Sequence, residues 1–498
     1  MTPTIMKPLG MKPMRLFLAG VALSALAACA TDPLGHQTAG IDAPAAWNDL
    51  PAKKGAQVLA SSDKVTVEQR WWHSFGDPTL DRLVDTALAN NKTLAQAEAR
   101  VAEARAQRAG SVAQLLPEVQ GSGDFQRGNQ GFASNNKAIT IKEGQLQASW
   151  EVDLFGKNQA RAAAAGAILE SEDARRQAAM VSLLAEVARN YFDLRNDQTQ
   201  IDITEKNLGT QQRTLDLIQV QFKGALANQL DVSRAAAQVA TTSARLPTLR
   251  AAYATTMNHL NILLGDKPGT NDGWIAPPQA MKPLSPTILV AAPATVLASR
   301  PDIRAAERNF AASVSTSKAA SKEIFPTISL TSFFGIQDSS LFANANPWGA
   351  AAGLTQPILE FGRIQADIDT ANARQKQAYL GYQETVLEGL EDMENALALY
   401  FNESSRQHDL ATAADQDRRA VDLANRQYQA GYTGLLDLLV AQQSELDAES
   451  SLAASDAELR KNLVHIYTAA GGGWDLDTRK PRAAVAQTAA KGTASNPS

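Results

Sequence analysis

The chain has 498 residues, of which 44% are hydrophobic, 20% charged and 6% aromatic, and its formal net charge is -5 at pH 7. This length suffices to bury a large core, and a mild acidity spread along the chain offers no basic surface for nucleic acid. The single cysteine excludes an intrachain disulfide, and no two of the five histidines have the spacing of metal ligands. We also find no nucleophile–base pair and no phosphate-binding glycine loop, so we expect no catalytic site and no metal site.

A secretory signal is predicted for residues 1–28. Three basic residues precede an apolar run of 13 residues, from Leu16 to Ala28, which is too short to span a bilayer as a helix because that takes about 20 residues. The run ends in LAAC, which resembles the lipobox of bacterial lipoproteins, in which the cysteine, here Cys29, becomes the acylated first residue. The alternative is an ordinary signal cleaved after an Ala-x-Ala site, with Cys29 as an incidental thiol.

Residue 30 is alanine rather than aspartate, which by the usual sorting pattern directs a lipoprotein to the outer membrane. We therefore expect a covalent lipid on Cys29 and no other cofactor, a lipidated segment at residues 29–75, and a location in the outer membrane of a Gram-negative bacterium. No later stretch approaches 20 apolar residues in a row, so a membrane crossing by this chain would use strands.

Four segments are predicted as strands, near residues 118–128, 142–154, 327–337 and 349–359. In the clearest one every second residue is apolar, namely Leu146, Ala148, Trp150, Val152 and Leu154. Ten alternating residues tilted by about 45° cover the roughly 25 Å apolar band of an outer-membrane barrel, so we expect these five side chains to face lipid. A half-buried strand of a soluble sheet shows the same alternation and is the alternative.

Long helices follow the strands. One has an apolar residue at every seventh position, namely Met180, Val187, Leu194, Ile201, Leu208, Leu215 and Phe222. A seven-residue apolar repeat indicates a coiled-coil seam. After a glycine-containing turn a second helix is expected to return, and Pro247 is expected to bend or interrupt it.

The same series of elements occurs twice. Three pairs of matching residues share one offset in residue number, here called the repeat offset, namely Phe155 with Phe361, Phe222 with Tyr428, and Asp231 with Asp437. We expect a first repeat at 76–265, an equatorial linker at 266–300, a second repeat at 301–470, and a C-terminal tail at 471–498 that is disordered after residue 475.

Four strands are too few to close a barrel, and open strand edges are not tolerated in hydrocarbon. Several copies must therefore share one barrel, and three copies would supply 12 strands. The predicted fold is thus α + membrane β: a homotrimeric 12-stranded outer-membrane β-barrel, continued by a long α-helical coiled-coil barrel in the periplasm.

Several motifs together resemble the TolC-like outer-membrane factors, in the lipoprotein branch of the NodT/OprM type. They are LAAC, DLFGKNQARAAAA from Asp153, RPDIRAAE at Arg300–Glu307, YQAGYTGLLDLLVAQ at Tyr428–Gln442 and GGGW at Gly471–Trp474. The match covers roughly residues 66–475. It implies a passive exit duct for drugs or other small toxic compounds, which works with a periplasmic adaptor (membrane fusion protein) and an inner-membrane resistance-nodulation-division (RND) pump.

The resemblance also implies roles for the two turns between the long helices and their return helices. The residues expected to form an adaptor-docking tip are Gly224, Ala225, Leu226, Gly431, Tyr432 and Thr433. The alternative is that these glycines only end the helices, because glycine permits any tight reversal of the chain.

Next to the tips the resemblance implies a closed periplasmic aperture, and the candidate residues are Leu436, Asp437, Asp231 and Arg426. The ionic lock of the relatives is carried over in part, since Val440 and Gln443 stand where those proteins carry charged residues. Three copies of Asp437 around a narrow axis would repel anions and attract cations; a solvated charge at the tip is the alternative.

Two other functions fit parts of the pattern. A TolC-like duct could serve heavy-metal efflux or type I protein secretion, because the cargo is set by the partners. From a different class, a coiled-coil structural or surface scaffold lipoprotein would combine long helices with strands, but it would need neither the lipobox nor two strands in each repeat.

Overall fold

The computed structural model describes residues 40–48, 57–62, 68–129, 138–279, 281–284, 287–340 and 344–475. Cys29 and the signal lie outside the described residues, as does the tail after residue 475. The chain divides into two compact units. One is built mainly from residues 111–164 and 310–377, and the other from residues 41–110, 165–309 and 378–498.

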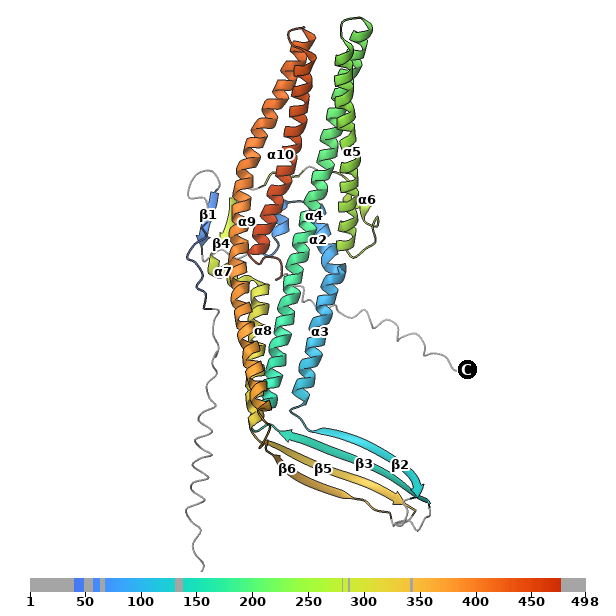
Figure 1. Ribbon diagram of the computed structural model, residues 1–498, viewed down its shortest axis with the longest axis vertical. Helices are drawn as coiled ribbons and strands as arrows, with labels where there is room; N and C mark the ends of the chain where they lie inside the picture. The colour runs from blue at the N-terminus through green and yellow to red at the C-terminus, as the bar shows by residue number, and fades with distance from the viewer. Residues whose placement is uncertain are drawn as a thin grey trace, which may run out of the picture. The chain divides into compact units, whose positions relative to one another are not determined.

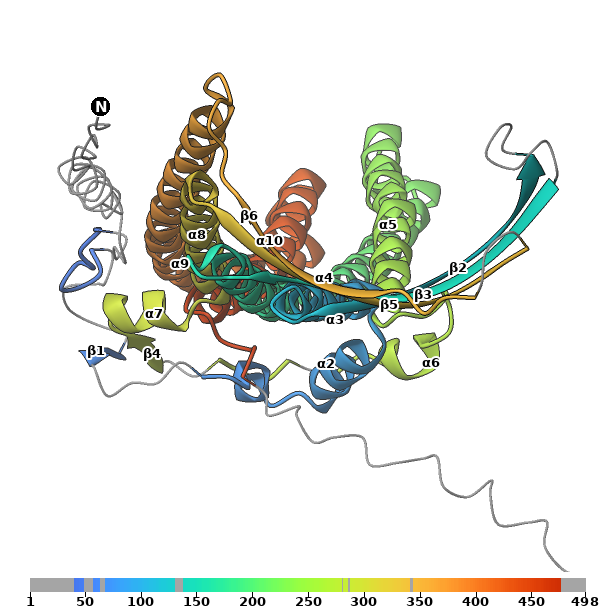
Figure 2. The same ribbon diagram turned by 90° about the horizontal axis from the view of Figure 1, so that it is seen from below.

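The first unit contains a four-stranded antiparallel sheet in the order β2-β3-β5-β6. Its strands are β2 (Glu118–Asn129), β3 (Ala138–Val152), β5 (Thr327–Ser339) and β6 (Trp348–Thr355) (Figure 1). Seen along the edge in Figure 2, the sheet curves strongly along its strands. The last strand ends at Thr355 rather than near residue 359, because Pro357 follows and proline cannot donate to a strand ladder.

The register of the sheet sorts apolar and polar side chains onto opposite faces. On one face Leu146 lies opposite Phe334, Trp150 opposite Leu330, and Val152 opposite Ile328. On the other face Ser149 lies opposite Thr331 and Glu151 opposite Ser329. Because the side-chain period of a strand is two residues, a slip of one residue would exchange these faces.

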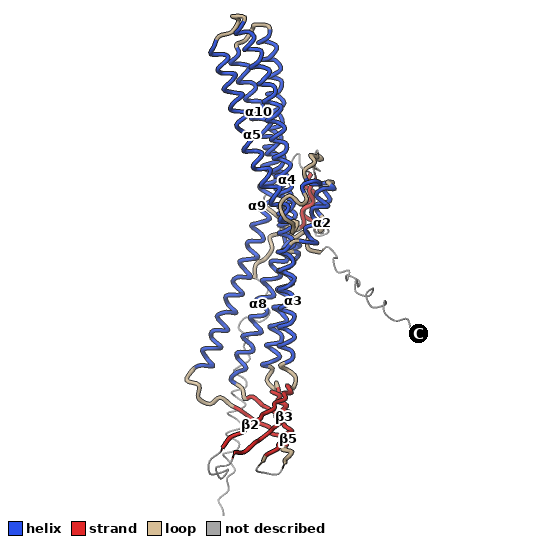
Figure 3. Tube along the Cα trace, turned by 90° about the vertical axis from the view of Figure 1, so that its right-hand side faces the viewer, coloured by secondary structure: helices blue, strands red, loops and turns tan. Residues whose placement is uncertain are grey.

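Two helical hairpins follow the strand pairs, and Figure 3 shows their long paired helices. The first joins α4 (Lys157–Lys223) to α5 (Gln229–Leu263), and the second joins α9 (Arg363–Gln429) to α10 (Leu435–Ala469). Each long helix has 67 residues and each return helix has 35, and all four boundaries of the first hairpin recur in the second at the repeat offset. The internal duplication is thereby confirmed. At 1.5 Å per residue a long helix extends over about 100 Å.

Each strand pair is also attached to the helix before it in the same way. Helix α3 (Lys92–Ala113) precedes β2, and α8 (Pro301–Ser321) and the short η3 (Lys322–Ile324) precede β5. The Trp150 indole Nε1 donates to the Leu115 carbonyl at 3.0 Å, and the Gln356 amide Nε2 donates to the Ile324 carbonyl at 3.1 Å. The two donors are separated by the repeat offset, so the duplication extends to this contact.

The main hydrophobic core lies in the second unit, around the C-terminal ends of the return helices α5 and α10. It is completed by η1 (Trp71–Phe75), α2 (Pro78–Asn90), α6 (Asp272–Ile275), α7 (Pro293–Ser299) and β4 (Thr287–Ala291). The backbone of β4 pairs in parallel with β1 (Gln57–Ser62). Trp71 is fully buried and stacks on Tyr467 with ring centroids 5.8 Å apart. Among the described helices, none combines the length and apolar character needed to cross a membrane.

The predicted coiled-coil positions are confirmed near this core. Met180, Val187 and Leu194 are buried in α4. The residues that the repeat offset relates to them in α9, Val386, Met393 and Tyr400, are buried as well. Farther along α4 the prediction holds only in part, because Leu215 is buried whereas Ile201 and Leu208 are half-buried and Phe222 is exposed.

The expected interruption at Pro247 is also absent, since α5 continues through it. The side chains of Thr242 and Leu246, just before it, are buried. Packing of this turn holds the helix together despite the backbone hydrogen bond that proline removes.

Gly265, just after α5, allows the C-terminal end of α5 to approach the end of α2 closely. Its φ is +78°, and a Cβ there would lie 2.3 Å from the Asn90 carbonyl oxygen. Gly269 has a similar φ of +88° but nothing within 4 Å of its Cβ position.

We predict that Gly265→Ala lowers the free energy of unfolding by about 2 kcal/mol more than Gly269→Ala, because both variants strain the backbone and the Cβ added at position 265 would also clash with Asn90. Thermal unfolding of the two variants in detergent measures this, and equal losses would show that the close approach to Asn90 is unimportant.

Candidate functional site

The two hairpin turns have the same backbone hydrogen bonds. In the first, the Leu226 N–H donates to the Gln221 carbonyl at 2.8 Å; in the second, the Tyr432 N–H donates to the Gln427 carbonyl at 2.8 Å. These closures satisfy carbonyl groups at the ends of the long helices. Each turn therefore has a defined backbone conformation.

The two turns differ in the residue that adopts the left-handed conformation. In the second turn it is Gly431, with φ +77°, whereas in the first it is Ala225, with φ +57°. The first turn contains Gly224, but the positive φ falls on the residue after it. Alanine has a steric cost there that glycine avoids.

The tips present an apolar side chain at the same place in both repeats. Leu226 is 83% exposed and Tyr432 is 84% exposed, and the repeat offset relates their positions. The other predicted tip residues are exposed too, except Thr433, which is half-buried. Large exposed apolar side chains on a fixed turn favour contact with another protein.

The four residues predicted for the aperture do not form one cluster. Leu436 and Asp437 are exposed in the first turn of α10, and Asp231 is half-buried in the first turn of α5. Arg426 forms an ion pair with Asp422 on its own helix. Among the described residues Asp437 has no ion-pair partner, so within one chain Arg426 does not neutralise it.

Asp231 instead influences a tyrosine at the tip of the other hairpin. Tyr428 donates its hydroxyl hydrogen to the Gln221 side chain at 2.7 Å, which connects α9 with α4. Burial raises the pKa of Tyr428, and the negative charge of Asp231 raises it further. The tyrosine therefore stays protonated and keeps this contact between the hairpins.

A polar stripe interrupts the expected apolar seam of α4 before the buried Leu215 and Ile218. Its buried residues follow the alternating spacing of three and four that marks a coiled-coil seam, and they are Thr204, Asn207, Gln211 and Thr214. Gln442 of α10 donates to the Thr214 hydroxyl at 3.1 Å, and Gln200 donates to the Ser450 carbonyl at 2.7 Å. The same spacing, read for polar residues, was the sequence signal that would have revealed this stripe.

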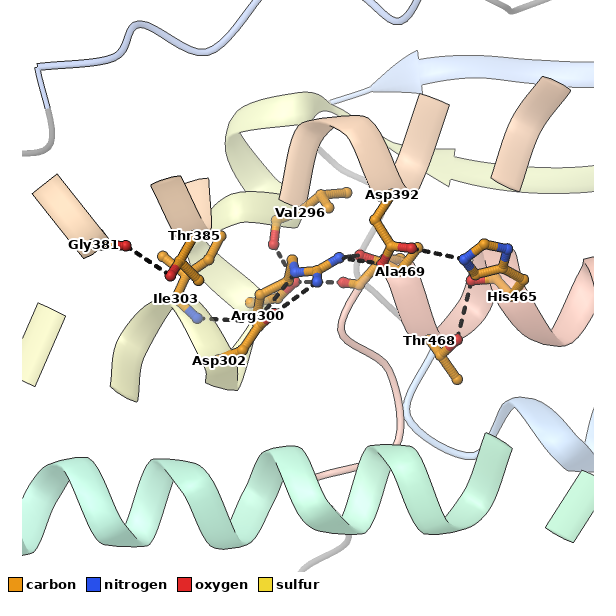
Figure 4. Close-up of polar contacts among 12 residues, drawn as sticks. Val296, Arg300, Asp302, Ile303, Gly381, Thr385, Asp392, His465, Thr468 and Ala469 are labelled. Carbon is orange, nitrogen blue, oxygen red and sulfur yellow. Dashed lines mark hydrogen bonds and ion pairs between the residues drawn. The ribbon is translucent and has the colours of Figure 1, made fainter. Parts of the chain in front are cut away.

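Toward the core, Arg300 of the RPDIR motif connects three helices (Figure 4). Its guanidinium donates to Asp302 at the start of α8, at 2.7 and 3.1 Å, and to Asp392 of α9 at 2.9 Å. It also donates to the Ala469 carbonyl in the last turn of α10, at 2.8 Å. The motif thus connects the start of α8 and the last turn of α10 to α9, a role that the sequence did not reveal.

In the sheet, four of the five side chains predicted to face lipid lie on one face. Leu146, Ala148, Trp150 and Val152 share the apolar face of β3, and Leu154 follows the strand. Leu146 and Leu154 are exposed and the other three are half-buried. That this face contacts lipid remains a prediction.

Comparison with known proteins gives one consistent result. The family model described as "Outer membrane efflux protein" matches residues 83–266 and 292–472. The chain is 31% identical over 481 residues to the pyoverdine export outer membrane protein OpmQ of Pseudomonas putida, covering 94% of this chain and 99% of that protein. It is 29% identical over 473 residues to the toluene efflux pump outer membrane protein TtgC of Pseudomonas putida, covering 90% and 93%.

Among solved structures, the outer-membrane channel OprN superposes with a TM-score of 0.79 at 30% identity. The alignment covers 88% of this chain and 98% of OprN. Fold and sequence therefore both relate the chain to proteins of the outer membrane.

The strained Ala225 provides a test of the tip geometry. We predict that Ala225→Gly stabilises the first turn by about 1 kcal/mol and that Gly431→Ala destabilises the second by a similar amount. Gly224→Ala is the matched control, because Gly224 lacks a positive φ and its Cβ position is 3.4 Å from the nearest atom. Amide hydrogen exchange of peptides spanning the two turns reports these changes. Slower exchange in Gly431→Ala than in the unmodified chain would contradict the assignment.

Proposed function

The chain belongs to the outer membrane efflux protein family, and we propose that three copies of this outer-membrane efflux channel close a common 12-stranded barrel. The observation that supports this is the sheet, which ends in two strands, β2 and β6, that each pair on one side. Unpaired backbone groups at those edges cost several kcal/mol each in hydrocarbon. A neighbouring copy satisfies them.

The duplication specifies how the edges meet. β2 and β5 are each the first strand of a repeat, and we align them by their first residues, Glu118 and Thr327. β3 and β6 are each the second strand of a repeat, and the repeat offset aligns them. The pairing of β3 with β5 inside one chain is therefore the template for pairing β6 with β2 of the next copy. Applied to the observed register, this relation places Ala351 opposite Gln126 and Leu354 opposite Gly123, and it keeps the apolar face continuous.

An aromatic contact between the residues just after β3 and just before β5 supports the same arrangement. Phe155 stacks on Phe325 with ring centroids 4.7 Å apart, which joins the first repeat to the second. The equivalents of these residues are Phe361, which is 91% exposed, and Leu116, which is also exposed. In a ring of repeats, Phe361 of one copy packs on Leu116 of the next and both become buried.

For the export function, we propose that the duct receives small toxic compounds, including drugs, from a periplasmic adaptor and an inner-membrane RND pump. The two relatives OpmQ and TtgC have similar identity to this chain but are named for pyoverdine and toluene. Cargo therefore follows the pump, and the duct is a passive path with no catalytic step of its own.

The remaining predicted sites take their places in this proposal. A lipid on Cys29 anchors the chain, and the apolar face of β3 contacts the lipid of the outer membrane. Leu226 and Tyr432 dock the adaptor through their exposed side chains. Three copies of Asp437, with Leu436 beside it, line the periplasmic aperture and favour cations.

Transport itself is tested in cells. We predict that deletion of the gene raises the steady-state accumulation of a fluorescent efflux dye severalfold, and that the unmodified gene restores it. A variant with Leu226→Asp and Tyr432→Asp should reach the outer membrane yet fail to restore efflux, because the adaptor loses its apolar contacts. Unchanged dye accumulation after deletion, in a strain without a second duct, would contradict export.

The shared barrel is tested by cross-linking. We predict that the double variant Gln126→Cys, Ala351→Cys forms covalent dimers and trimers on mild oxidation, because the two positions are opposed on the same face of neighbouring copies. Non-reducing electrophoresis measures this. Gln126→Cys with Ala350→Cys is the control, since position 350 points to the opposite face; cross-linking of the control with equal yield, or none in either variant, would exclude the register.

A further inference from the structure

Helix α9 exposes an acidic face for which its own chain supplies no basic partner. Residues 384–394 contain five acidic residues and no lysine or arginine. Asp392 and Glu394 have partners in the same chain. The other three are exposed and form no ion pair within the part of the chain that the structure describes, namely Glu384, Glu388 and Glu391. Like charges one turn apart destabilise a helix, so a cation from elsewhere would relieve this repulsion.

An exposed leucine lies on the same face. Leu387 is 54% exposed, and the repeat offset relates it to Val181 of α4. Val181 lines a cavity of about 510 Å³ that is also lined by Arg300 and Pro301 at the start of α8. The second repeat therefore faces this side of α4, whereas the equivalent side of α9 is open.

The junction between α4 and α8 shows how one repeat covers the next. Ser171 of α4 donates to the Ala305 carbonyl at 2.9 Å, and Glu170 pairs with Arg308 at 3.2 Å. Because the two helices run in opposite directions (Figure 1), Pro301 lies farther along α4, at the cavity. The small residues that α4 contributes to the cavity are Ala178, Ser182 and Ala185. The repeat offset relates them to Glu384, Glu388 and Glu391.

Lys92 has in the first repeat the position that Pro301 has in the second. Asn91 and Arg300 each precede a helix, and each donates to the carbonyl of the last residue of a return helix, at 2.9 and 2.8 Å. The repeat offset relates the two acceptors, so Lys92 follows Asn91 as Pro301 follows Arg300. Lys92 is exposed and has no ion-pair partner among the residues described. In a ring of repeats, Lys92 of the next copy faces α9 close to Glu384.

A second lysine follows from the loops after the return helices. Gly265 and Gly471 have φ of +78° and +79°. In both loops the N–H of the following residue donates to the carbonyl five residues before it. The two loops therefore start alike, and Lys267 has the position of Gly473.

This position lies against the long helix of the neighbouring repeat. A Cβ on Gly473 would be 2.9 Å from the Leu184 Cδ1 of α4. The repeat offset relates Leu184 to Leu390 of α9, which is followed by Glu391. Lys267 is exposed, and in the ring Lys267 of the next copy lies beside Glu391.

We propose that α9 of one copy docks on the next copy through these charges, with Lys92 opposite Glu384 and Lys267 opposite Glu391. This contact rests on the proposed three-copy duct and specifies how its helical parts adhere. The long side chains fill the space that small residues leave empty at the junction within the chain. Leu387 becomes buried between them, and the enclosed ion pairs are screened less by salt than exposed ones.

Cross-linking of the full-length protein in detergent tests the contact. We expect Lys92→Cys with Glu384→Cys to give covalent trimers with a short thiol-specific cross-linker, because side chains as long as lysine and glutamate span a wider gap than a disulfide does. Lys92→Cys with Asn395→Cys is the matched control. Asn395 is exposed but lies about 16 Å farther along α9 at 1.5 Å per residue, so this pair should give monomers, as should each single cysteine variant.

An exchange of charges tests whether the contact stabilises the trimer. We expect Glu384→Lys and Lys92→Glu each to speed dissociation of the trimer about fivefold, because each replaces an ion pair by like charges. The double variant has the same net charge as the unmodified chain and should restore the slow rate. Native electrophoresis over time in detergent measures the trimer fraction, and high salt should reduce the effect of the single variants.

The outcomes separate this contact from the shared barrel. If Lys92→Cys with Glu384→Cys gives monomers while Gln126→Cys with Ala351→Cys still forms trimers, the barrel stands and the α9 contact is overturned. If neither pair cross-links, both are overturned. A double charge variant that dissociates faster than either single variant would overturn the pairing of Lys92 with Glu384. An effect of Glu384→Lys that disappears when residues 476–498 are deleted would assign the acidic face to that basic segment and overturn the proposal.

Discussion

The outer edges of β2 and β6 impose the constraint on which the rest of the architecture depends. A strand edge in hydrocarbon must find backbone partners, and one chain provides four strands with both outer edges open. The duplication offers a solution, because the inner junction between β3 and β5 already shows how one repeat meets the next. A ring of identical junctions then requires that the exposed apolar residues at the two edges, such as Phe361 and Leu116, are contact residues rather than free surface.

The repeats preserve backbone geometry more faithfully than side-chain chemistry. Helix bounds, turn hydrogen bonds and the attachment of each strand pair recur in both repeats, whereas the residues at equivalent places diverge. Ala225 occupies the position of Gly431, and Asn91 that of Arg300. Shared geometry keeps the elements compatible around a ring, while the divergent side chains give the two hairpins different contacts at equivalent places.

The sequence predicted the long helices and the strands well because their signals are periodic and local. Period-seven apolar residues located the buried part of α4 around Met180, Val187 and Leu194, and alternation located β3. The aperture remains a prediction; within one chain Arg426 pairs with Asp422 rather than with Asp437, and sequence proximity alone did not reveal that choice of partner. The conformation of Ala225 and the continuity of α5 through Pro247 depend on tertiary packing, which no local pattern encodes. Cys29 lies outside the described residues, so the lipid anchor remains a prediction.

The distribution of buried surface along the hairpins indicates where they yield. Near the core, α4 and α9 bury Val187, Leu194 and Met393 completely or nearly so, and separation there would expose large apolar areas at about 25 cal/mol per Å². Farther along α4 the buried residues Thr204, Asn207, Gln211 and Thr214 are polar, and hydrogen-bonded groups such as the Thr214 hydroxyl exchange protein partners for water at much smaller net cost. Near the hairpin turns a small apolar cluster of Ile218, Leu435 and Leu439 joins α4 to α10. Apolar contacts therefore resist separation at both ends of this polar stretch, and the stretch between them is the part that separates at least cost.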